Sequence, residues 1–257
     1  MNTTTTLVSD PNATGVKSTM TVDKIESALN SRYRDDLAAS LPAGIEPSGY
    51  ARAMCAMIRA KSDVISCTPE SLLTAILGAA RSGLDPATGG FYFVKYGNEC
   101  EFVLSYKGML QLAREAGQII DLFARVVREG DRFEWVQGAT ESIKHEPDPG
   151  IDRETRQITH VYAVAVLPSG RQLFECWDRS RLDAHVLKNV KSATSKSSPW
   201  QKDFEQMARK TLIKQFFSTG RLAMSAPING AETEGATTDT APQDADDLQG
   251  FTLPVPK

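Results

Sequence analysis

The sequence predicts an α+β domain in which an antiparallel, hairpin-rich sheet packs with helices. Apolar residues recur at helical spacing near the start and the end of the chain, whereas the middle alternates with a period of two between turn signals. Helices therefore come first, hairpins follow, and helices return at the end. A doubly wound fold would instead alternate single strands with helices along the whole chain.

Three helices are expected before the sheet. The first covers residues 22–40 and the second residues 47–60, each with an apolar stripe along one face. The third begins after Thr68, an N-cap residue type, with Pro69 at the first helical position. Gly83 is expected to end this helix in the left-handed conformation that helix C-termini favour.

Strand signals dominate the middle of the chain. The expected hairpins pair residues 90–95 with 99–104, 119–127 with 132–136, and 157–167 with 171–177. A further strand is expected at residues 141–146, and further helices at 105–116, 178–188 and 200–217.

The chain divides by composition into three parts. Residues 1–20 and 224–257 are rich in small and polar residues, so we expect both segments to be disordered. Residues 21–223 are expected to form one ordered domain. No apolar run is long enough to span a bilayer and the start lacks a signal-peptide pattern, so an intracellular protein is expected.

Few residues suggest catalysis. The four cysteines are scattered, which favours reduced thiols over disulfides or a zinc site, and the three histidines are isolated. Neither phosphate-binding glycine motif occurs, so no nucleotide cofactor is expected. Glu99, Glu101 and Asp121 could hold Mg²⁺ in a nuclease, but they lack the supporting Asp and Glu-x-Lys pattern. We therefore expect no catalytic residues and no metal, with a nuclease left as the enzyme alternative.

Charge is distributed unevenly along the chain. Residues 231–257 contain six acidic residues and one basic residue, a balance of −5, whereas residues 179–221 contain ten basic and three acidic residues, a balance of +7. A basic segment followed by an acidic tail is typical of nucleic-acid-binding proteins. Ordinary solvated helix faces would give a similar count, so charge alone leaves both interpretations open.

The first candidate DNA-binding motif is Ser105-Tyr106-Lys107-Gly108, where a strand is expected to pass into a helix. Ser105 suits the N-cap, and the helix N-terminus it caps can hold a phosphate. Lys107 adds a positive charge, and Gly108 has no side chain to keep a backbone away. An ordinary capped helix with a surface lysine is the alternative.

The second candidate is the last helix with its serine-rich lead-in. One face is expected to carry polar and basic residues, namely Lys202, Gln206, Arg209, Lys210 and Lys214. The lead-in adds Lys188, Lys191 and Lys196. Together they could follow a phosphate backbone. The alternative, a solvated helix face, would normally mix both signs of charge.

Aromatic residues crowd the first hairpin and the helix after it. These are Phe91, Tyr92, Phe93, Tyr96 and Tyr106. Some could stack on DNA bases, while strand alternation is expected to direct about half of them into the core.

The chain resembles the RecT family of phage and prophage single-strand annealing recombinases. The resemblance is carried in order by residues 72–86, 105–109, 112–119, 162–165, and 198–200 with 207–211. It covers about residues 45–222 and implies that residues 21–223 form a DNA-binding, annealing and oligomerisation domain. It implies the RecT and Red-beta type of annealing fold and a protein of a bacterial host cytoplasm that has no enzymatic activity.

The resemblance also implies a mechanism and partners. Family members bind single-stranded DNA, anneal complementary strands without ATP, and assemble into rings or helical filaments. They work beside a 5′→3′ exonuclease and host single-strand binding protein. Lys107, Arg209, Lys210 and Lys214 are then the best candidates for phosphate contacts, followed by the remaining lysines of the second motif. A metal-dependent exonuclease and a passive single-strand coat protein are the alternatives.

Overall fold

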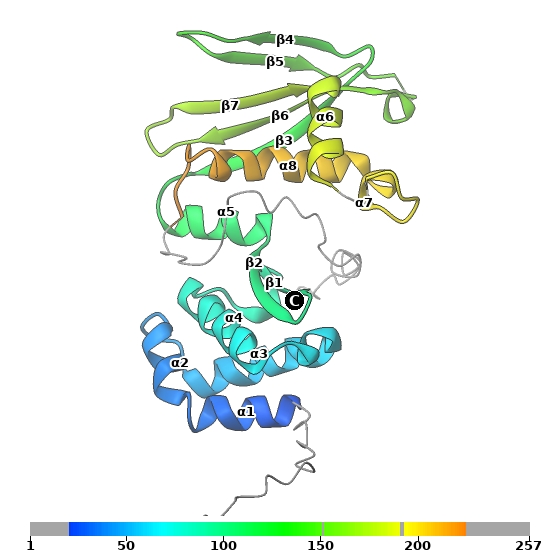
Figure 1. Cartoon of the computed structure of the whole chain (residues 1–257). Coiled ribbons are helices and arrows are strands. Elements are labelled where there is room, and N and C mark those ends of the chain that lie inside the picture. The colour runs from blue at the N-terminus through cyan, green and yellow to red at the C-terminus, as the bar shows by residue number, and fades with distance from the viewer. Residues whose placement is uncertain (1–20, 151, 191–192, 225–257) are drawn as a thin grey trace, which may run out of the picture.

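The computed structural model describes residues 21–150, 152–190 and 193–224 (Figure 1). The predicted disorder at both ends therefore lies outside the described residues, apart from residue 224. Figure 1 shows a helical region at one end of the molecule and a sheet region at the other, with α5 between them. The α+β class with antiparallel strands is confirmed.

The helical region comprises four α-helices, two short 3-10 helices and one hairpin. The α-helices are α1 (Val22–Asn30), α2 (Arg34–Ser40), α3 (Pro47–Ala60) and α4 (Pro69–Ser82). The 3-10 helices are η1 (Ser62–Ser66) and η2 (Pro86–Thr88), and the hairpin is β1 (Phe91–Tyr96) with β2 (Glu99–Leu104). One core of buried apolar side chains joins these elements.

The single helix predicted over residues 22–40 is wrong, because the chain breaks after Asn30. The side chain of Asn30 bonds the carbonyl of Glu26 at 3.0 Å, and the Ser31 hydroxyl donates to the carbonyl of Ser27 at 2.6 Å. Such local side-chain bonds compete with helix continuation. The caps of α4 are as predicted, with Thr68 accepting from the Ser71 amide and Gly83 at φ 71°.

The sheet region is built from a three-stranded sheet, a two-stranded ribbon and four helices. The sheet has the order β3 (Asp121–Arg128), β6 (Ile158–Val166) and β7 (Gln172–Asp178), and the ribbon pairs β4 (Arg132–Val136) with β5 (Ser142–Glu146). The helices are α5 (Tyr106–Glu115), α6 (Arg179–Asn189), α7 (Pro199–Lys202) and α8 (Phe204–Ser218), and η3 (Arg153–Thr155) precedes β6.

The predicted hairpin between residues 119–127 and 132–136 is wrong. Strand β3 pairs with β6, and β4 pairs with β5. The Asp131 carboxylate accepts hydrogen bonds from the amides of Arg128 and Asp148, both at 2.9 Å, and so bends the chain out of the sheet after β3. The ribbon then covers one sheet face, where Phe133 and Trp135 pack on the buried side chains.

The other face of the sheet is covered by α8 (Figure 1). The last predicted helix is divided at Asp203, whose side chain caps α8 by accepting from the Gln206 amide at 3.2 Å. All four cysteines are free thiols, as expected. Among the described residues, no helix combines the length and apolarity of a membrane span.

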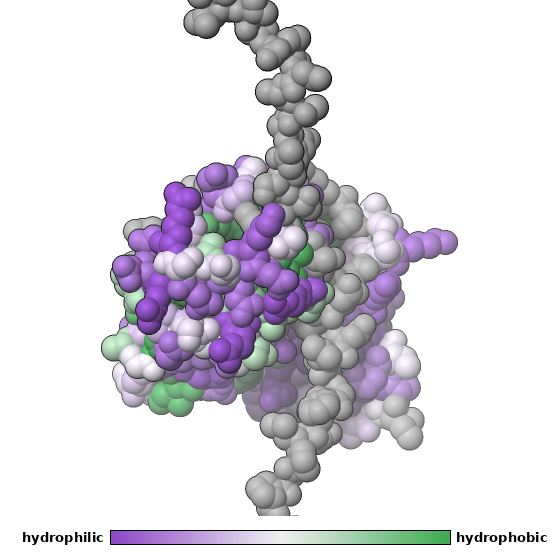
Figure 2. Space-filling view, turned by 90° about the horizontal axis from the view of Figure 1, so that it is seen from below, coloured by the Kyte–Doolittle hydropathy of each residue, from purple (hydrophilic) through white to green (hydrophobic). Residues whose placement is uncertain are grey.

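The molecular face viewed in Figure 2 is the end of the molecule that α1–α3 occupy in Figure 1. Its described residues are predominantly hydrophilic, and the apolar spots on it are small and separate. The features that suggest DNA binding lie instead on α5, α8 and the segments beside them.

Candidate nucleic-acid interface

The start of α5 has the predicted cap. The Ser105 hydroxyl accepts a hydrogen bond from the Gly108 amide at 3.1 Å and donates one to the Gly89 carbonyl at 2.8 Å. The Ser105 amide also donates to the Gly90 carbonyl at 3.0 Å. Ser105 is buried, and its hydroxyl fixes the start of the helix.

Gly108 is also buried, against the protein's own backbone. A Cβ atom added at this position would lie 2.0 Å from the carbonyl oxygen of Gly90, far inside contact distance. The absence of a side chain at Gly108 therefore allows α5 to pack against Gly90, the residue before β1. Of the four residues in this motif, Lys107 is exposed and Tyr106 half-exposed, and these two remain candidates for direct contact with DNA.

The two candidate motifs meet at Tyr106 and Lys210. The Lys210 ammonium nitrogen lies 5.8 Å from the centre of the Tyr106 ring, within the range of a cation–π interaction. These residues are separated by about a hundred positions in the sequence, and helices α5 and α8 bring them together (Figure 1). Lys210 of the second motif therefore lies beside Tyr106 of the first.

Helix α8 has one buried and one partly exposed face. The buried side chains pack beneath the sheet and are Met207, Ala208, Leu212, Ile213, Phe216 and Phe217. Lys210 and Lys214 are half-exposed and lie one turn apart. The predicted core side of this helix is confirmed at Met207, Ala208 and Leu212, whereas the basic face stays a prediction and Lys202 belongs to α7.

Arg209 occupies a different environment from its lysine neighbours. It forms an ion pair with Glu205, and Glu205 also accepts from the guanidinium of Arg128. Arg128 in turn donates to Glu154 at 3.2 Å and to the Arg156 carbonyl at 2.9 Å. A phosphate at Arg209 would compete with the Glu205 carboxylate, so Arg209 is the most constrained of the predicted contacts.

The lead-in lysines lie around α6 and α7. Lys188 is exposed in the last turn of α6, Lys196 is exposed in the loop before α7, and Lys202 is exposed at the end of α7. Lys191 lies outside the described residues. The structure therefore brings Lys188, Lys196 and Lys202 to the part of the sheet region where α8 begins.

The aromatic residues of the first hairpin separate as alternation requires. Phe91 and Phe93 are buried in the core of the helical region, whereas Tyr92 and Tyr96 are half-exposed on the other side of β1. Tyr106 packs against the second core with part of its ring exposed. Only the three tyrosines retain a surface that could meet a base.

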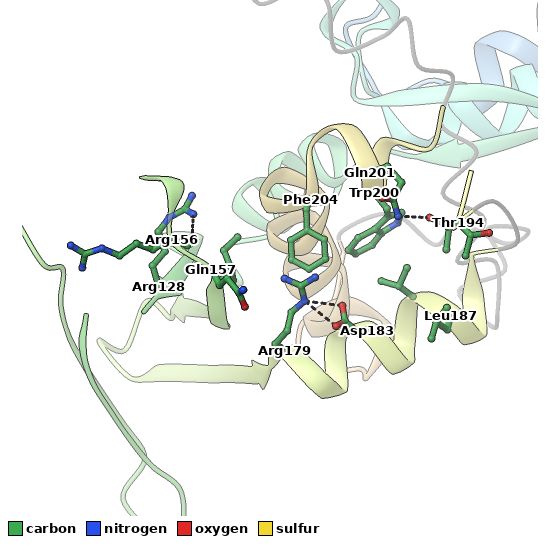
Figure 3. Close-up of a pocket in the computed structure, with 13 residues that line it drawn as sticks. Arg128, Arg156, Gln157, Arg179, Asp183, Leu187, Thr194, Trp200, Gln201 and Phe204 are labelled. Carbon is green, nitrogen blue, oxygen red and sulfur yellow. Dashed lines mark hydrogen bonds and ion pairs between the residues drawn. The ribbon is translucent and has the colours of Figure 1, made fainter. Parts of the chain in front are cut away.

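A pocket of about 550 Å³, which sequence analysis did not predict, is lined by residues of α6 and α7 among others (Figure 3). Its wall includes Arg128, Arg156 and Arg179 together with Trp200 and Phe204. The three arginines come from β3, from the residue after η3, and from α6. Because their proximity depends on the pairing of β3 with β6, only a correct strand register would have revealed it.

A second cluster that the sequence did not reveal surrounds Asp131. Its carboxylate, with 0% side-chain exposure, is bonded by Arg153 at 2.7 and 2.8 Å and by His145 at 3.0 Å. Burial raises the pKa of this carboxyl, but hydrogen bonds from Arg153, from the amides of Arg128 and Asp148, and from His145 outweigh it. The net pKa of Asp131 therefore lies far below its ordinary value.

His145 is buried between Asp131 and the Tyr162 hydroxyl, which lies 3.1 Å from its Nδ1 atom, so it serves this cluster. In the part of the chain that the structure describes, no group of three or more His, Cys, Asp or Glu side chains is placed to hold a metal ion.

Comparison with known proteins identifies the family. A model described as the RecT family matches residues 48–244. The chain is 35% identical to protein RecT of Escherichia coli strain K12 over 222 residues, which cover 81% of this chain and 80% of that protein. It is also 29% identical to the uncharacterized protein YqaK of Bacillus subtilis strain 168 over 161 residues, covering 62% of this chain and 52% of YqaK. The chain belongs to the RecT family, whose members are DNA-binding recombination proteins that anneal single strands.

Proposed function

We propose that this protein anneals complementary DNA strands without ATP, and that it holds the first strand by its phosphates along the surface formed by the start of α5 and the basic face of α8. Membership of the RecT family supports the general role in recombination and annealing. The residues assigned to the phosphates are Lys107, Lys210 and Lys214, with Lys188, Lys196 and Lys202 extending the path and Arg209 reached only by displacing Glu205.

The observation that carries this proposal is the contact between Lys210 and Tyr106. It joins two motifs that suggest DNA binding independently, one through a capped helix N-terminus and the other through a basic helix face. Neither alone exceeds what an ordinary protein surface offers. Their contact places a lysine beside an aromatic ring, and cations together with aromatic rings are the combination that single-strand binding uses.

The mechanism follows from what annealing requires. A strand gripped by its phosphates leaves its base edges available, so Watson–Crick pairing with the second strand provides the test of sequence. Base stacking in the product releases about 1–2 kcal/mol per step, so no nucleotide needs to be hydrolysed. The protein contributes a high local concentration of extended strand and screens the repulsion between the two backbones.

Assembly and partners are part of the same proposal. Protomers arranged in a ring or filament would join their basic surfaces end to end and keep a long strand extended. A 5′→3′ exonuclease would supply the single strands, and host single-strand binding protein would be displaced from them. These features follow from the family and support a task in phage-type recombination.

The decisive experiment measures the rate at which complementary labelled oligonucleotides pair, with and without protein and in the absence of nucleotide. Acceleration is expected, together with tighter retention of two strands added in sequence than of a preformed duplex. Binding of each strand without faster pairing would identify a passive coat protein. Shortening of a labelled duplex in Mg²⁺ would identify an exonuclease. Either result would overturn the proposal.

A further inference from the structure

The pocket beside α6 has a fixed, flat cation in its wall (Figure 3). The Nε atom of Arg179 lies 2.9 and 3.0 Å from the two carboxylate oxygens of Asp183. The guanidinium carbon of Arg179 lies 4.0 Å from the centre of the Phe204 ring, a close cation–π contact. Trp200 supports Phe204 edge-on, with ring centroids 5.7 Å apart. A guanidinium held in this way can stack against a second planar group.

The charges of the pocket are already balanced. Arg179 is paired with Asp183, and Arg128 with Glu154 and Glu205. Arg156 likewise pairs with the two carboxylates Asp148 and Asp152. A phosphate entering the pocket would have to displace these carboxylates. The interior therefore favours a neutral ligand that is flat and has hydrogen-bonding edges.

The remaining walls suit such a ligand. Val186 and Ile158 provide apolar surface, and Gln157, Gln201 and Thr194 provide polar groups. Leu187 also lines the pocket, with 70% of its surface exposed. A planar ring lying in the pocket would cover Leu187. The volume of about 550 Å³ lies in the range of small-molecule sites.

Three lysines that could bind phosphates are close neighbours, in the sequence, of residues that line the pocket. Lys188 follows Leu187 in the chain, Lys202 follows Gln201, and Lys196 lies two residues after Thr194, all three with exposed side chains. A neutral, aromatic-lined pocket with lysines beside it matches a nucleotide whose base is inside and whose backbone phosphates remain at the surface. Stacking of this kind is tolerant of sequence, because every base has a flat face.

We propose that this pocket takes one unpaired base of the bound single strand, stacked on the guanidinium of Arg179, while the phosphates of that nucleotide meet the neighbouring lysines. This inference rests on the proposed function, because it assumes that the ligand is single-stranded DNA. It adds a base contact to a surface otherwise assigned to phosphates. Such a base anchors the strand until pairing withdraws it.

The test compares two probes of equal length: an oligothymidylate, and the same backbone with tetrahydrofuran abasic sites in place of every base. The intact protein is expected to bind the oligothymidylate roughly fivefold or more tightly than the abasic strand. Arg179→Lys keeps the positive charge but removes the flat face, so it should weaken only oligothymidylate binding. The salt dependence, which reports phosphate contacts, should be unchanged.

A matched pair of surface substitutions provides the control. Leu187→Ser alters the pocket wall, whereas Ile120→Ser makes the same kind of change at an aliphatic side chain of similar exposure just before β3. Leu187→Ser should reduce the preference for bases and Ile120→Ser should not. Because both side chains are exposed, neither variant is expected to disturb folding, and the test survives if Arg179→Lys does not fold.

The outcomes separate the pocket from the proposed function. Equal affinity for the two probes, or a base preference that persists in both pocket variants, would overturn the pocket assignment while leaving annealing intact. Failure of the intact protein to bind either probe would instead overturn the proposed function. A base preference lost in Arg179→Lys and Leu187→Ser, but kept in Ile120→Ser, is the result that the pocket requires.

Discussion

The helical region and the sheet region use charge in opposite ways. In the helical region, Arg59 joins α3 to Asp23 and Glu26 of α1, but these groups lie at the surface, and the Asp23 side chain is 87% exposed. In the sheet region, the Asp131 carboxylate is fully buried and ties together segments from three parts of the chain. The first region combines apolar packing with buried hydrogen bonds of neutral groups, such as that from the Tyr50 hydroxyl to the Leu84 carbonyl at 3.3 Å, whereas the second also depends on a buried charged carboxylate.

The largest expected effect is that of Asp131→Ala. It would leave the largely buried Arg153 guanidinium and two backbone amides without their acceptor, so the free energy of unfolding should fall by about 3 kcal/mol or more. Asp23→Ala, which removes one partner of an exposed pair, should cause no measurable change. Urea unfolding of both variants provides the measurement. Equal losses in the free energy of unfolding would contradict the difference between the two regions.

Acid should weaken the sheet region through the same carboxyl group. Because the pKa of Asp131 is lower in the folded protein than in the unfolded chain, its contribution to stability is complete above about pH 4, the ordinary aspartate value. That contribution is lost progressively as the pH falls below this value. Between about pH 6 and pH 2, the free energy of unfolding should fall less in Asp131→Asn than in the natural protein.

The next effect in size concerns two glycine-to-alanine substitutions. Gly108→Ala would place its methyl group against the Gly90 carbonyl and should destabilise the protein by about 1–3 kcal/mol. Gly78→Ala, in the middle of α4, meets only the Phe102 ring at 3.7 Å and should be neutral or stabilising, because alanine favours a helix. Thermal melting points moving in opposite directions would support this. A Gly108→Ala variant as stable as the natural protein would contradict the close approach.

A smaller effect is expected on DNA affinity. Lys210→Ala should weaken single-strand binding roughly fivefold at 0.1 M salt and make the slope of log K against log salt shallower by ~0.7. Lys144→Ala, on the β4–β5 ribbon, is the matched control and should change neither quantity. Lys210 is a cleaner choice than Arg209, whose removal would also alter the Glu205–Arg128 ion pair. Equal effects of the two lysine variants on DNA affinity would show that α8 is not part of the DNA-binding surface.

The smallest effect concerns the acidic segment of residues 231–257. With a charge of −5 it should compete with DNA for the basic sheet region. Its deletion should raise single-strand affinity modestly at low salt and leave annealing in place, and the gain should disappear above about 0.1 M salt, where the screening length is ~10 Å. Loss of assembly or annealing in the shortened protein would show that this segment does more than compete.

The sequence predicted features that depend on neighbouring residues. Thr68, Gly83 and the Gly97-Asn98 turn were correct because a cap or a turn is decided within a few positions. The predicted partner of β3 was wrong. The true partner, β6, lies about thirty residues away in the sequence, whereas the turn residues at Gly130 favoured pairing with the next strand. The start of α5 and the basic face of α8 could be proposed separately, but their meeting at Tyr106 and Lys210 could not.

The pocket is a second feature that neighbouring residues in the sequence could not predict. Arg128 and Arg179 are separated by fifty residues and approach each other only because Arg128 pairs in register with Ile158. Any prediction that paired β3 with β4 would have separated them. Phe204 was correctly expected on the inner side of the last helix, but its contact with Arg179 requires knowledge of where α6 lies.

The junction at Gly90 and Gly108 has a mechanical consequence. Ser105 bonds the carbonyls of both Gly89 and Gly90, and the Gly108 backbone rests on Gly90 without any intervening side chain. Because these contacts are short and leave little space, the joint resists bending. If a DNA strand is held at the start of α5 as proposed, tension on that strand would therefore be shared by both regions, and the molecule would respond to pulling as a single stiff unit.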